Sequence, residues 1–399
     1  MHLPSERVYR EMRSEEASLW VVPANCGEEL AILIKAPTSA IKALVAGCRL
    51  ELQFGKVGEY LCAGARIHDM PDAPMLISGA QRELEEHQAL VRLLHGRKTP
   101  VFLFNELDAC LAWTNLEITE VDASAVTALV GAVSRLYVGP FTKDCSRALD
   151  CFCYSSDPSQ SYPDAENIPL VSVDLMLEHW RANHVSYAGV RTHQTITIND
   201  ANEGETFERA IWASLESVFP LTLHKNPQVQ TGEKLRELTD VLAFHRYGSF
   251  LIEAKDLSLL QAGYERDQDR RTRGVQKQVR KAIVQLVGAA KSVLRGDRIM
   301  DDRGVELNVV RDQPPHCIVL ITELMHTGDW TEVEALLAEA ALTTRAFFHL
   351  LDLRELITLL KGSSGKPELL EVNLMQRAKI FVERGSIHIR SRMGPADDA

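Results

Sequence analysis

The stretch LTDVLAFHRYGSFLIEAKD, residues 238–256, decides how the second half of the chain is interpreted. Two apolar runs flank a Tyr-Gly pair, and this pattern predicts a β-hairpin. The second run ends in Glu253-Ala254-Lys255, and Asp240 stands at the start of the first. Because side chains two residues apart in a strand point to the same side, Glu253 and Lys255 are expected to share one face.

The hairpin is expected to gather three charged side chains. A turn centred on Tyr247–Gly248 would place Asp240 opposite Lys255 and Leu242 opposite Glu253. Cross-strand neighbours lie about 5 Å apart, so the three charges would form one cluster. Two carboxylates at that separation suit Mg²⁺, which takes oxygen ligands, commonly one or two carboxylates with waters and a phosphate. A lysine beside them can orient or deprotonate an attacking water, or balance charge on a phosphate, which favours phosphodiester hydrolysis.

The same spacing also fits a purely structural arrangement. Asp240 and Lys255 could form a cross-strand ion pair, with Glu253 turned toward solvent. Such pairs are common and stabilise a sheet little. Spacing within the hairpin leaves both interpretations open.

Helices and strands alternate around the hairpin. Apolar residues at helical spacing predict a helix over 203–219, and others over 274–296 and 330–345. Strands are expected over 316–324 and 346–353, the second followed by a helix with Asp352 as its N-cap. Helices interleaved with strands in this way predict an α/β fold, with a mixed sheet covered by helices.

The first half of the chain is β-rich. Seven short apolar or alternating runs between residues 18 and 119 are separated by turn residues, and one helix is expected over 80–96. An α+β domain with one antiparallel sheet or a partly open barrel is expected, with a further helix around 173–183. The turn-rich NDANEG places the domain boundary near residue 200, giving domains 1–199 and 200–399, with a sub-boundary near 155–169.

Composition limits the classes of function. The 399 residues carry a net charge of −11, so nucleic-acid binding would need a local basic patch. The run 265–281 is such a patch, although charge runs are usually solvated faces. No apolar run reaches the roughly 18 residues of a membrane helix, and no secretory signal is visible. The eight cysteines lack paired spacing, so free thiols and a cytoplasmic location are expected.

The order of elements around the hairpin carries a resemblance. GETFERAIWASL (204–215), then TDVLAF and FLIEAKD, then a Gln-bearing helix resemble the PD-(D/E)xK nuclease superfamily, nearest its restriction-endonuclease-like, Mrr- and RecB-type members. The resemblance covers about residues 200–390. It implies that Asp240, Glu253 and Glu208 hold metal, and that Lys255 positions or activates the attacking water. Thr239 stands where the family often has proline.

The resemblance also implies supporting residues. Gln278 or Gln285 would match the family's helical glutamine, and both candidates stay open. In the basic run, phosphate contacts are expected from Arg271, Arg273 and Lys277, and they would give sequence-independent affinity. Glu203 and Glu205 are weaker rivals to Glu208, since each also suits the first turn of a helix.

The implied function is that of a magnesium-dependent endodeoxyribonuclease. Mn²⁺ is expected to substitute for Mg²⁺, and the substrate is expected to be double-stranded DNA. Residues 1–199 would act as a sensor, specificity or assembly domain. This domain could contact a second copy of the chain or a partner protein in a defence system against phage or foreign DNA. No membrane partner is expected. Two alternatives remain: a non-catalytic nucleic-acid-binding or assembly protein on a degenerate nuclease fold, and an RNA-directed nuclease.

Overall fold

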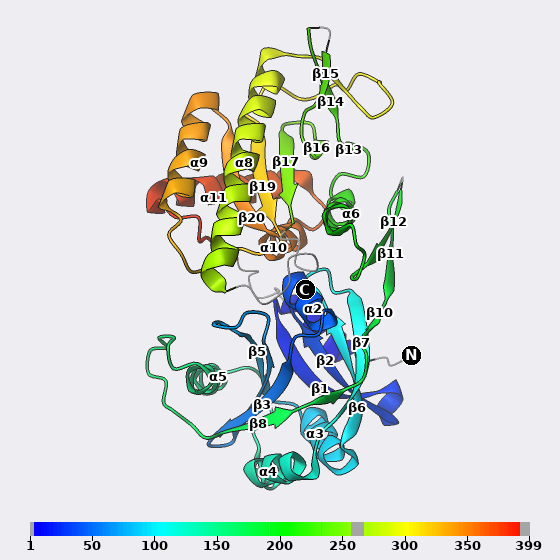
Figure 1. The fold of residues 1–399 in the computed structure, drawn as a ribbon, viewed down its shortest axis with the longest axis vertical. Helices are drawn as coiled ribbons and strands as arrows, with labels where there is room; N and C mark the ends of the chain where they lie inside the picture. Colours follow the sequence, from blue (N-terminus) through cyan, green and yellow to red (C-terminus); the bar gives the residue numbers. More distant parts are fainter. Residues whose placement is uncertain (1–3, 191, 233, 257–266, 392–399) are drawn as a thin grey trace. The chain divides into compact units, whose positions relative to one another are not determined.

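The computed structural model describes residues 4–190, 192–232, 234–256 and 267–391. The described chain divides into two compact units, and the division falls between residues 185 and 200. Figure 1 shows the helices and strands of both units with their labels. All eight cysteines are free thiols, as the sequence predicts. In the described part of the chain, no helix has the length and apolarity needed to cross a bilayer.

The first unit contains two larger sheets. One has the order β1-β2-β6-β7-β10 with β9 also paired to β7, and it is mixed because β2 and β6 run parallel. The other, β5-β4-β3-β8, is antiparallel throughout. The strands are β1 (Ser18–Ala24), β2 (Glu29–Lys35), β3 (Leu50–Val57), β4 (Tyr60–Ile67), β5 (Met75–Gln81), β6 (Lys98–Phe104), β7 (Cys110–Glu117), β8 (Leu170–Asp174), β9 (Met176–Leu177) and β10 (Arg181–Ala182). The β-rich prediction is confirmed, whereas the single antiparallel sheet is wrong, because the strands form two sheets and one of them is mixed.

Helices complete the first unit. They are α1 (Glu6–Ser14), α2 (Thr38–Val45), α3 (Leu84–Gly96), α4 (Glu120–Val130) and α5 (Lys143–Ser156), with short 3₁₀ turns η1 (Asn25–Gly27) and η2 (Val133–Arg135). Helix α3 confirms the helix expected over 80–96, and a capping box of Glu83 and Glu86 begins it. The helix expected around 173–183 is wrong. Val171 and Val173 alternate at strand spacing and pair with Phe54 and Leu52 of β3, so β8 forms instead.

The second unit is built on a five-stranded sheet of order β13-β16-β17-β19-β20. Strands β13, β16 and β17 are antiparallel neighbours, whereas β17, β19 and β20 are parallel. The strands are β13 (Leu223–Lys225), β16 (Val241–Phe244), β17 (Ser249–Lys255), β19 (His316–Ile321) and β20 (Phe347–Asp352). The predicted mixed sheet is therefore confirmed.

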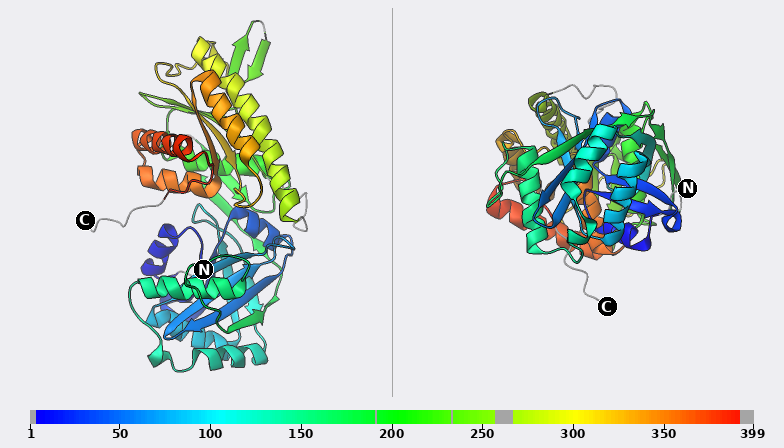
Figure 2. Two further views of the ribbon diagram at one scale, coloured as in Figure 1. Left: turned by 90° about the vertical axis from the view of Figure 1, so that its left-hand side faces the viewer. Right: turned by 90° about the horizontal axis from the view of Figure 1, so that it is seen from below.

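Helices cover both faces of this sheet. They are α6 (Glu203–Glu216), α8 (Gln268–Arg295), α9 (Thr331–Thr344), α10 (Leu353–Ser363) and α11 (Pro367–Arg384). Helices α8 and α9 lie on one face, and α10 and α11 on the other (Figure 2). Helix α8 buries a stripe that includes Val275, Val279, Ile283 and Leu286, which is why it packs along β17 and β19. Asp352 caps α10 by accepting a hydrogen bond from the Glu355 amide, as predicted.

The hairpin of β16 and β17 has a different register from the one predicted. The His245 amide donates to the Gly248 carbonyl at 2.9 Å, so Arg246 and Tyr247 form the turn. Leu242 therefore pairs with Leu251 rather than Glu253. Gly248 does not take the left-handed conformation that would have placed it at the centre of the turn. Extending the register by one residue brings Asp240 level with Glu253.

The chain from β13 to β16 forms a β-ribbon that starts and ends in the five-stranded sheet and passes through a second, smaller sheet. Strands β14 (Gln228–Thr231) and β15 (Lys234–Glu237) join β18 (Ile299–Met300) in a three-stranded sheet, although β13 leads into β14 and β15 leads into β16. At the junction, the Asn226 amide donates to the Asp240 carbonyl at 2.9 Å, and the Leu238 amide to the Pro227 carbonyl at 2.8 Å. A separate hairpin pairs β11 (His184–Ala188) with β12 (His193–Thr197). The ribbon's passage between the two sheets creates the site described next.

Candidate functional site

Asp240, Glu253 and Lys255 meet at the end of β17. The Lys255 Nζ lies 2.8 Å from a Glu253 carboxylate oxygen and 3.5 Å from an Asp240 carboxylate oxygen. Glu253 and Lys255 share a face of β17, and Asp240 reaches them from the ribbon junction. The expected cluster is present, although the register that produces it differs from the predicted one.

Backbone contacts hold the ribbon junction against β17. The Ala254 amide donates to Asp240 Oδ2 at 2.7 Å, the same carboxylate oxygen that lies nearest the Lys255 ammonium. The Thr239 hydroxyl donates to the Ile252 carbonyl at 2.8 Å, and Thr239 is buried. Thr239 therefore fixes the direction of Asp240, in the position where a proline was considered typical.

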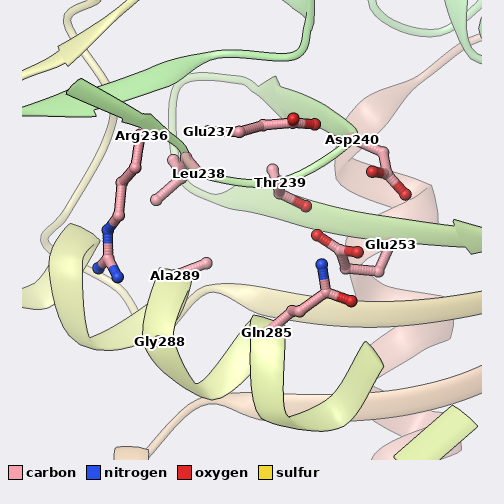
Figure 3. Close-up of a pocket in the computed structure, with 9 residues that line it drawn as sticks. All are labelled: Arg236, Glu237, Leu238, Thr239, Asp240, Glu253, Gln285, Gly288 and Ala289. Atoms are coloured by element: carbon pink, nitrogen blue, oxygen red, sulfur yellow. The ribbon is translucent and has the colours of Figure 1, made fainter. Parts of the chain in front are cut away.

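The cluster opens into a pocket of about 230 Å³. Its walls are the ribbon segment 236–240, Glu253 of β17, and Gln285, Gly288 and Ala289 of α8. Figure 3 shows the Gln285 amide pointing toward the Glu253 carboxylate. Of the two candidate glutamines, Gln285 therefore lies in the pocket. Gln278 is exposed about two helical turns earlier and is not part of its lining.

Burial and neighbouring charges shift the pKa values of Glu253 and Lys255. Glu253 is only 2 % exposed. Burial is the main cause that raises its pKa and the negative charge of Asp240 is the second, and together they outweigh the neighbouring Lys255 ammonium. Burial alone would lower the pKa of Lys255. The hydrogen bond to Glu253 and the charge of Asp240 outweigh it, and the pKa rises above its ordinary value. Lys255 is therefore protonated at neutral pH and suits charge stabilisation and orientation rather than deprotonation of water.

Glu208 lies beside the pocket rather than in its lining. It is half-buried on α6, and its carboxylate contacts the Lys225 ammonium at 3.1 Å. Its negative charge acts on Glu237, whose pKa is raised by partial burial and then by Asp240 and Glu208. Glu205 is held by Asn202 and Arg209 in the first turn of α6.

Glu203, the other rival, is buried in the same turn. Neither rival lines the pocket. Of the three candidate glutamates on α6, Glu208 is the one whose charge helps raise the pKa of Glu237, a residue of the pocket lining.

The expected phosphate contacts separate into two groups. Arg273 and Lys277 are exposed on α8, as is Lys281. Arg271 is instead 5 % exposed and donates to Glu323 at 2.8 Å, so the expectation that it meets phosphate at the surface is corrected. Burial without this partner would be costly, which explains the pairing. Residues 265 and 266 of the basic run lie outside the described residues.

Two pocket residues were missed by sequence reasoning. Arg236 and Glu237 end β15, a strand that was not predicted, and both line the pocket. All four residues of β15 are exposed, so the strand lacks the apolar alternation that would have revealed it. The only available signal was their position three and four residues before Asp240.

The donor set fits a hard divalent cation. Among the residues that the structure describes, no three His, Cys, Asp or Glu side chains form a complete metal-binding group. Mg²⁺ needs only one or two protein carboxylates, however, with water and phosphate as its other ligands. Asp240 and Glu253 supply such oxygens on one wall of the pocket, and burial followed by the charge of Asp240 keeps the pKa of Glu253 raised beside the Lys255 ammonium. The residues present therefore fit Mg²⁺ or Mn²⁺.

Comparison with known proteins adds no relative. No protein-family model, no curated protein sequence and no solved structure matches the chain.

Proposed function

We propose that the second unit is a magnesium-dependent endonuclease of the PD-(D/E)xK type that hydrolyses phosphodiester bonds in DNA. The observation that carries the proposal is the meeting of Asp240, Glu253 and Lys255, with the Lys255 Nζ at 3.5 Å from one carboxylate and 2.8 Å from the other. The order of elements supports it, because an antiparallel hairpin leads through α8 to a parallel strand. The expected resemblance depends on that order.

The residues of the pocket have separate roles in this proposal. Asp240 and Glu253 would hold the ion, and Glu208 would add negative charge beside it. A bound Mg²⁺ lowers the pKa of its water and offsets charge on the attacked phosphate. Protonated Lys255 donates hydrogen bonds and places a positive charge where negative charge grows during attack. Gln285 offers a neutral amide that can fix the backbone of the strand being cut.

A non-catalytic nucleic-acid-binding protein on the same fold is the second candidate. The burial of Glu253 beside Asp240 argues against it, because burying one carboxylate next to another costs free energy without serving a binding surface. Isothermal titration calorimetry with Mg²⁺ separates the candidates. The endonuclease proposal expects metal binding that is lost in Asp240→Asn, whereas the alternative expects none.

The direct test is cleavage of supercoiled plasmid, linear DNA and RNA in Mg²⁺ and in EDTA. Lys255→Ala should lower the initial rate at least about 100-fold, the usual loss when one charge-stabilising group is removed. Lys379→Ala is the matched control, because Lys379 is exposed on α11 and pairs only with exposed Glu383. Thermal unfolding of each variant shows that the fold persists. Undiminished DNA cutting by Lys255→Ala would refute the assignment, and cutting of RNA alone would transfer it to an RNA-directed nuclease.

A further inference from the structure

Arg236 places a positive charge in the same pocket as the carboxylates. It lies on β15 at the edge of the three-stranded sheet. Figure 3 shows its guanidinium pointing toward α8 near Gly288 and Ala289, on the opposite side of the pocket from Asp240 and Glu253. The pocket therefore has an acidic end and a basic end.

The basic end carries more positive than negative charge. Arg236 and Arg295 both donate to the Ser292 hydroxyl, at 3.2 and 3.3 Å. Arg295 also pairs with Asp297 at 2.6 Å. That hydrogen bond comes first among the causes that lower the pKa of Asp297, and the charge of Arg236 also contributes. Within the described residues, two guanidiniums thus lie near one carboxylate, and it is Arg295 that donates a hydrogen bond to it.

Helix α8 leaves open space in front of this guanidinium. A Cβ added at Gly288 would meet no heavy atom within 4 Å, so packing does not require the glycine there. The next residue, Ala289, is also small and lines the same wall.

We infer that Arg236 binds the phosphate next to the one that is cleaved, so that the pocket accepts a strand carrying at least two consecutive phosphates. The inference rests on the proposed function, because the carboxylate end is assigned to the scissile phosphate and its metal. Gln285, whose amide points toward Glu253 at the acidic end, offers an uncharged contact to the backbone of the strand. The substrate class is therefore a phosphodiester polymer, and a small diester with a single phosphate leaves Arg236 without a partner.

The first experiment measures binding separately from cleavage. A fluorescent DNA duplex is titrated with the full-length protein in Ca²⁺ in place of Mg²⁺, over a range of KCl concentrations. Arg236→Ala should bind about tenfold more weakly, since a hydrogen bond to a charged group contributes about 1.5 kcal/mol or more. The slope of log affinity against log salt should fall by about one phosphate contact. Arg236→Lys should recover part of the affinity.

Arg298 provides the matched control. It is an exposed arginine directly before β18 of the same three-stranded sheet, but it pairs with Glu306 at 3.0 Å and does not line the pocket. Arg298→Ala should bind within about twofold of wild type, because an exposed ion pair contributes little. If Arg236→Ala and Arg298→Ala weakened DNA binding equally, Arg236 would contribute only as one of the surface charges of the protein, and the inference would be overturned.

The second experiment removes the charge from the substrate. Once the cut bond is mapped in Mg²⁺, two duplexes are made, each with a neutral methylphosphonate at one of the two phosphates that flank the cut bond. Wild type should lose about the same tenfold affinity on one of these duplexes, and Arg236→Ala should lose no further affinity on that duplex. A full additional loss in Arg236→Ala, at both neighbours of the cut bond, contradicts the proposed contact.

Failure of the inference and failure of the proposed function give different results. A wild-type protein that neither binds nor cuts any duplex removes the proposed function, and the inference with it. A wild-type protein that binds and cuts normally, beside an Arg236→Ala variant equal to Arg298→Ala, removes the inference alone. Cleavage of a small single-phosphate diester that is as fast in Arg236→Ala as in wild type supports the assigned role.

Discussion

Two groups of buried charges lie at the five-stranded sheet, and they are compensated differently. In the pocket at the end of β17, the carboxylates of Asp240 and Glu253 share the ammonium of Lys255. At the end of β20, Asp352 and Glu355 each have an arginine of their own. Both groups join segments that are far apart in the sequence, yet only the second is saturated with partners.

The group at β20 uses nearly every available hydrogen bond. Both Asp352 oxygens accept from Arg390, at 2.6 and 2.7 Å, and the carboxylate also caps α10. Glu355 accepts from buried Arg377 at 2.9 Å and from the Ser391 hydroxyl at 2.8 Å. These contacts attach the chain after α11 to the sheet. We interpret the group as structural, because no charge is left for a ligand.

The pKa shifts of the two groups run in opposite directions. Burial raises the pKa of Glu253, and the neighbouring charge of Asp240 adds to it. Burial also acts on Asp352, but hydrogen bonds from Arg390 outweigh it and the pKa falls below its ordinary value. Burial of a carboxylate therefore does not by itself mark a functional site. A deficit of positive charge, as in the pocket, favours the uptake of a cation.

The largest expected effect is on stability, at the saturated group. Glu355→Ala leaves the Arg377 guanidinium buried without its carboxylate, and should lower the free energy of unfolding by about 3–5 kcal/mol. Urea unfolding followed by circular dichroism measures the change. Lys379→Ala, which breaks only an exposed pair, should change it by less than about 0.5 kcal/mol. A loss below about 1 kcal/mol for Glu355→Ala would show that the group is not structural.

The slope of stability against pH should have opposite signs for Glu253 in the pocket and Asp352 at the end of β20. The folded pKa of Glu253 lies above its ordinary 4.5, so the ionised carboxylate opposes folding. Relative to Glu253→Gln, wild type should therefore lose stability as the pH rises from about 4.5 through the folded pKa. Each unit of pKa difference corresponds to about 1.4 kcal/mol. Unfolding in urea between pH 3 and 8 in EDTA measures this slope.

Asp352 should show the opposite slope. Its folded pKa lies below its ordinary 3.8, so its contribution is present above that value and is lost as the pH falls through the folded pKa. Relative to Asp352→Asn, wild type should lose stability toward acid. Adding Mg²⁺ should reduce the slope at Glu253 and leave the slope at Asp352 unchanged. Slopes of equal sign at the two positions would contradict the difference in compensation.

The fold was predictable where apolar periodicity is strong. The stripe of α8 and the buried strands β17, β19 and β20 have clear patterns, and Asp352 was identified as a cap from its position alone. Strands β14 and β15 were missed because their stability comes from pairing with each other and with β18, not from an apolar face. The helix expected around 173–183 failed because tertiary pairing with β3 and β7 decided the structure of that segment.

The site was predictable only in part. Glu253 and Lys255 follow from the alternation of a strand, and Asp240 from its neighbourhood. The register of their hairpin depends on which two residues form the turn. The sequence favoured Tyr247 and Gly248, but the turn is formed by Arg246 and Tyr247, so Gly248 lies outside it. Arg236 and Gln285 could not be placed, since their meeting depends on the ribbon passing between two sheets. Charge compensation is likewise a property of the folded arrangement, and no local pattern encodes it.

The smallest expected effect concerns Gly288, which lines the pocket. Its substitution tests whether the pocket, unlike the group at β20, leaves room for a ligand at a cost in stability. Gly288 and Gly274 both lie inside α8, and an added Cβ meets nothing within 4 Å at either. Alanine at each should raise the free energy of unfolding by about 0.5–1 kcal/mol, because glycine is a poor helix former. Thermal unfolding measures both gains. Only Gly288→Ala should also weaken binding of a DNA duplex in Ca²⁺, since only Gly288 lines the pocket. Equal binding by the two variants would mean that the strand does not approach this wall of α8.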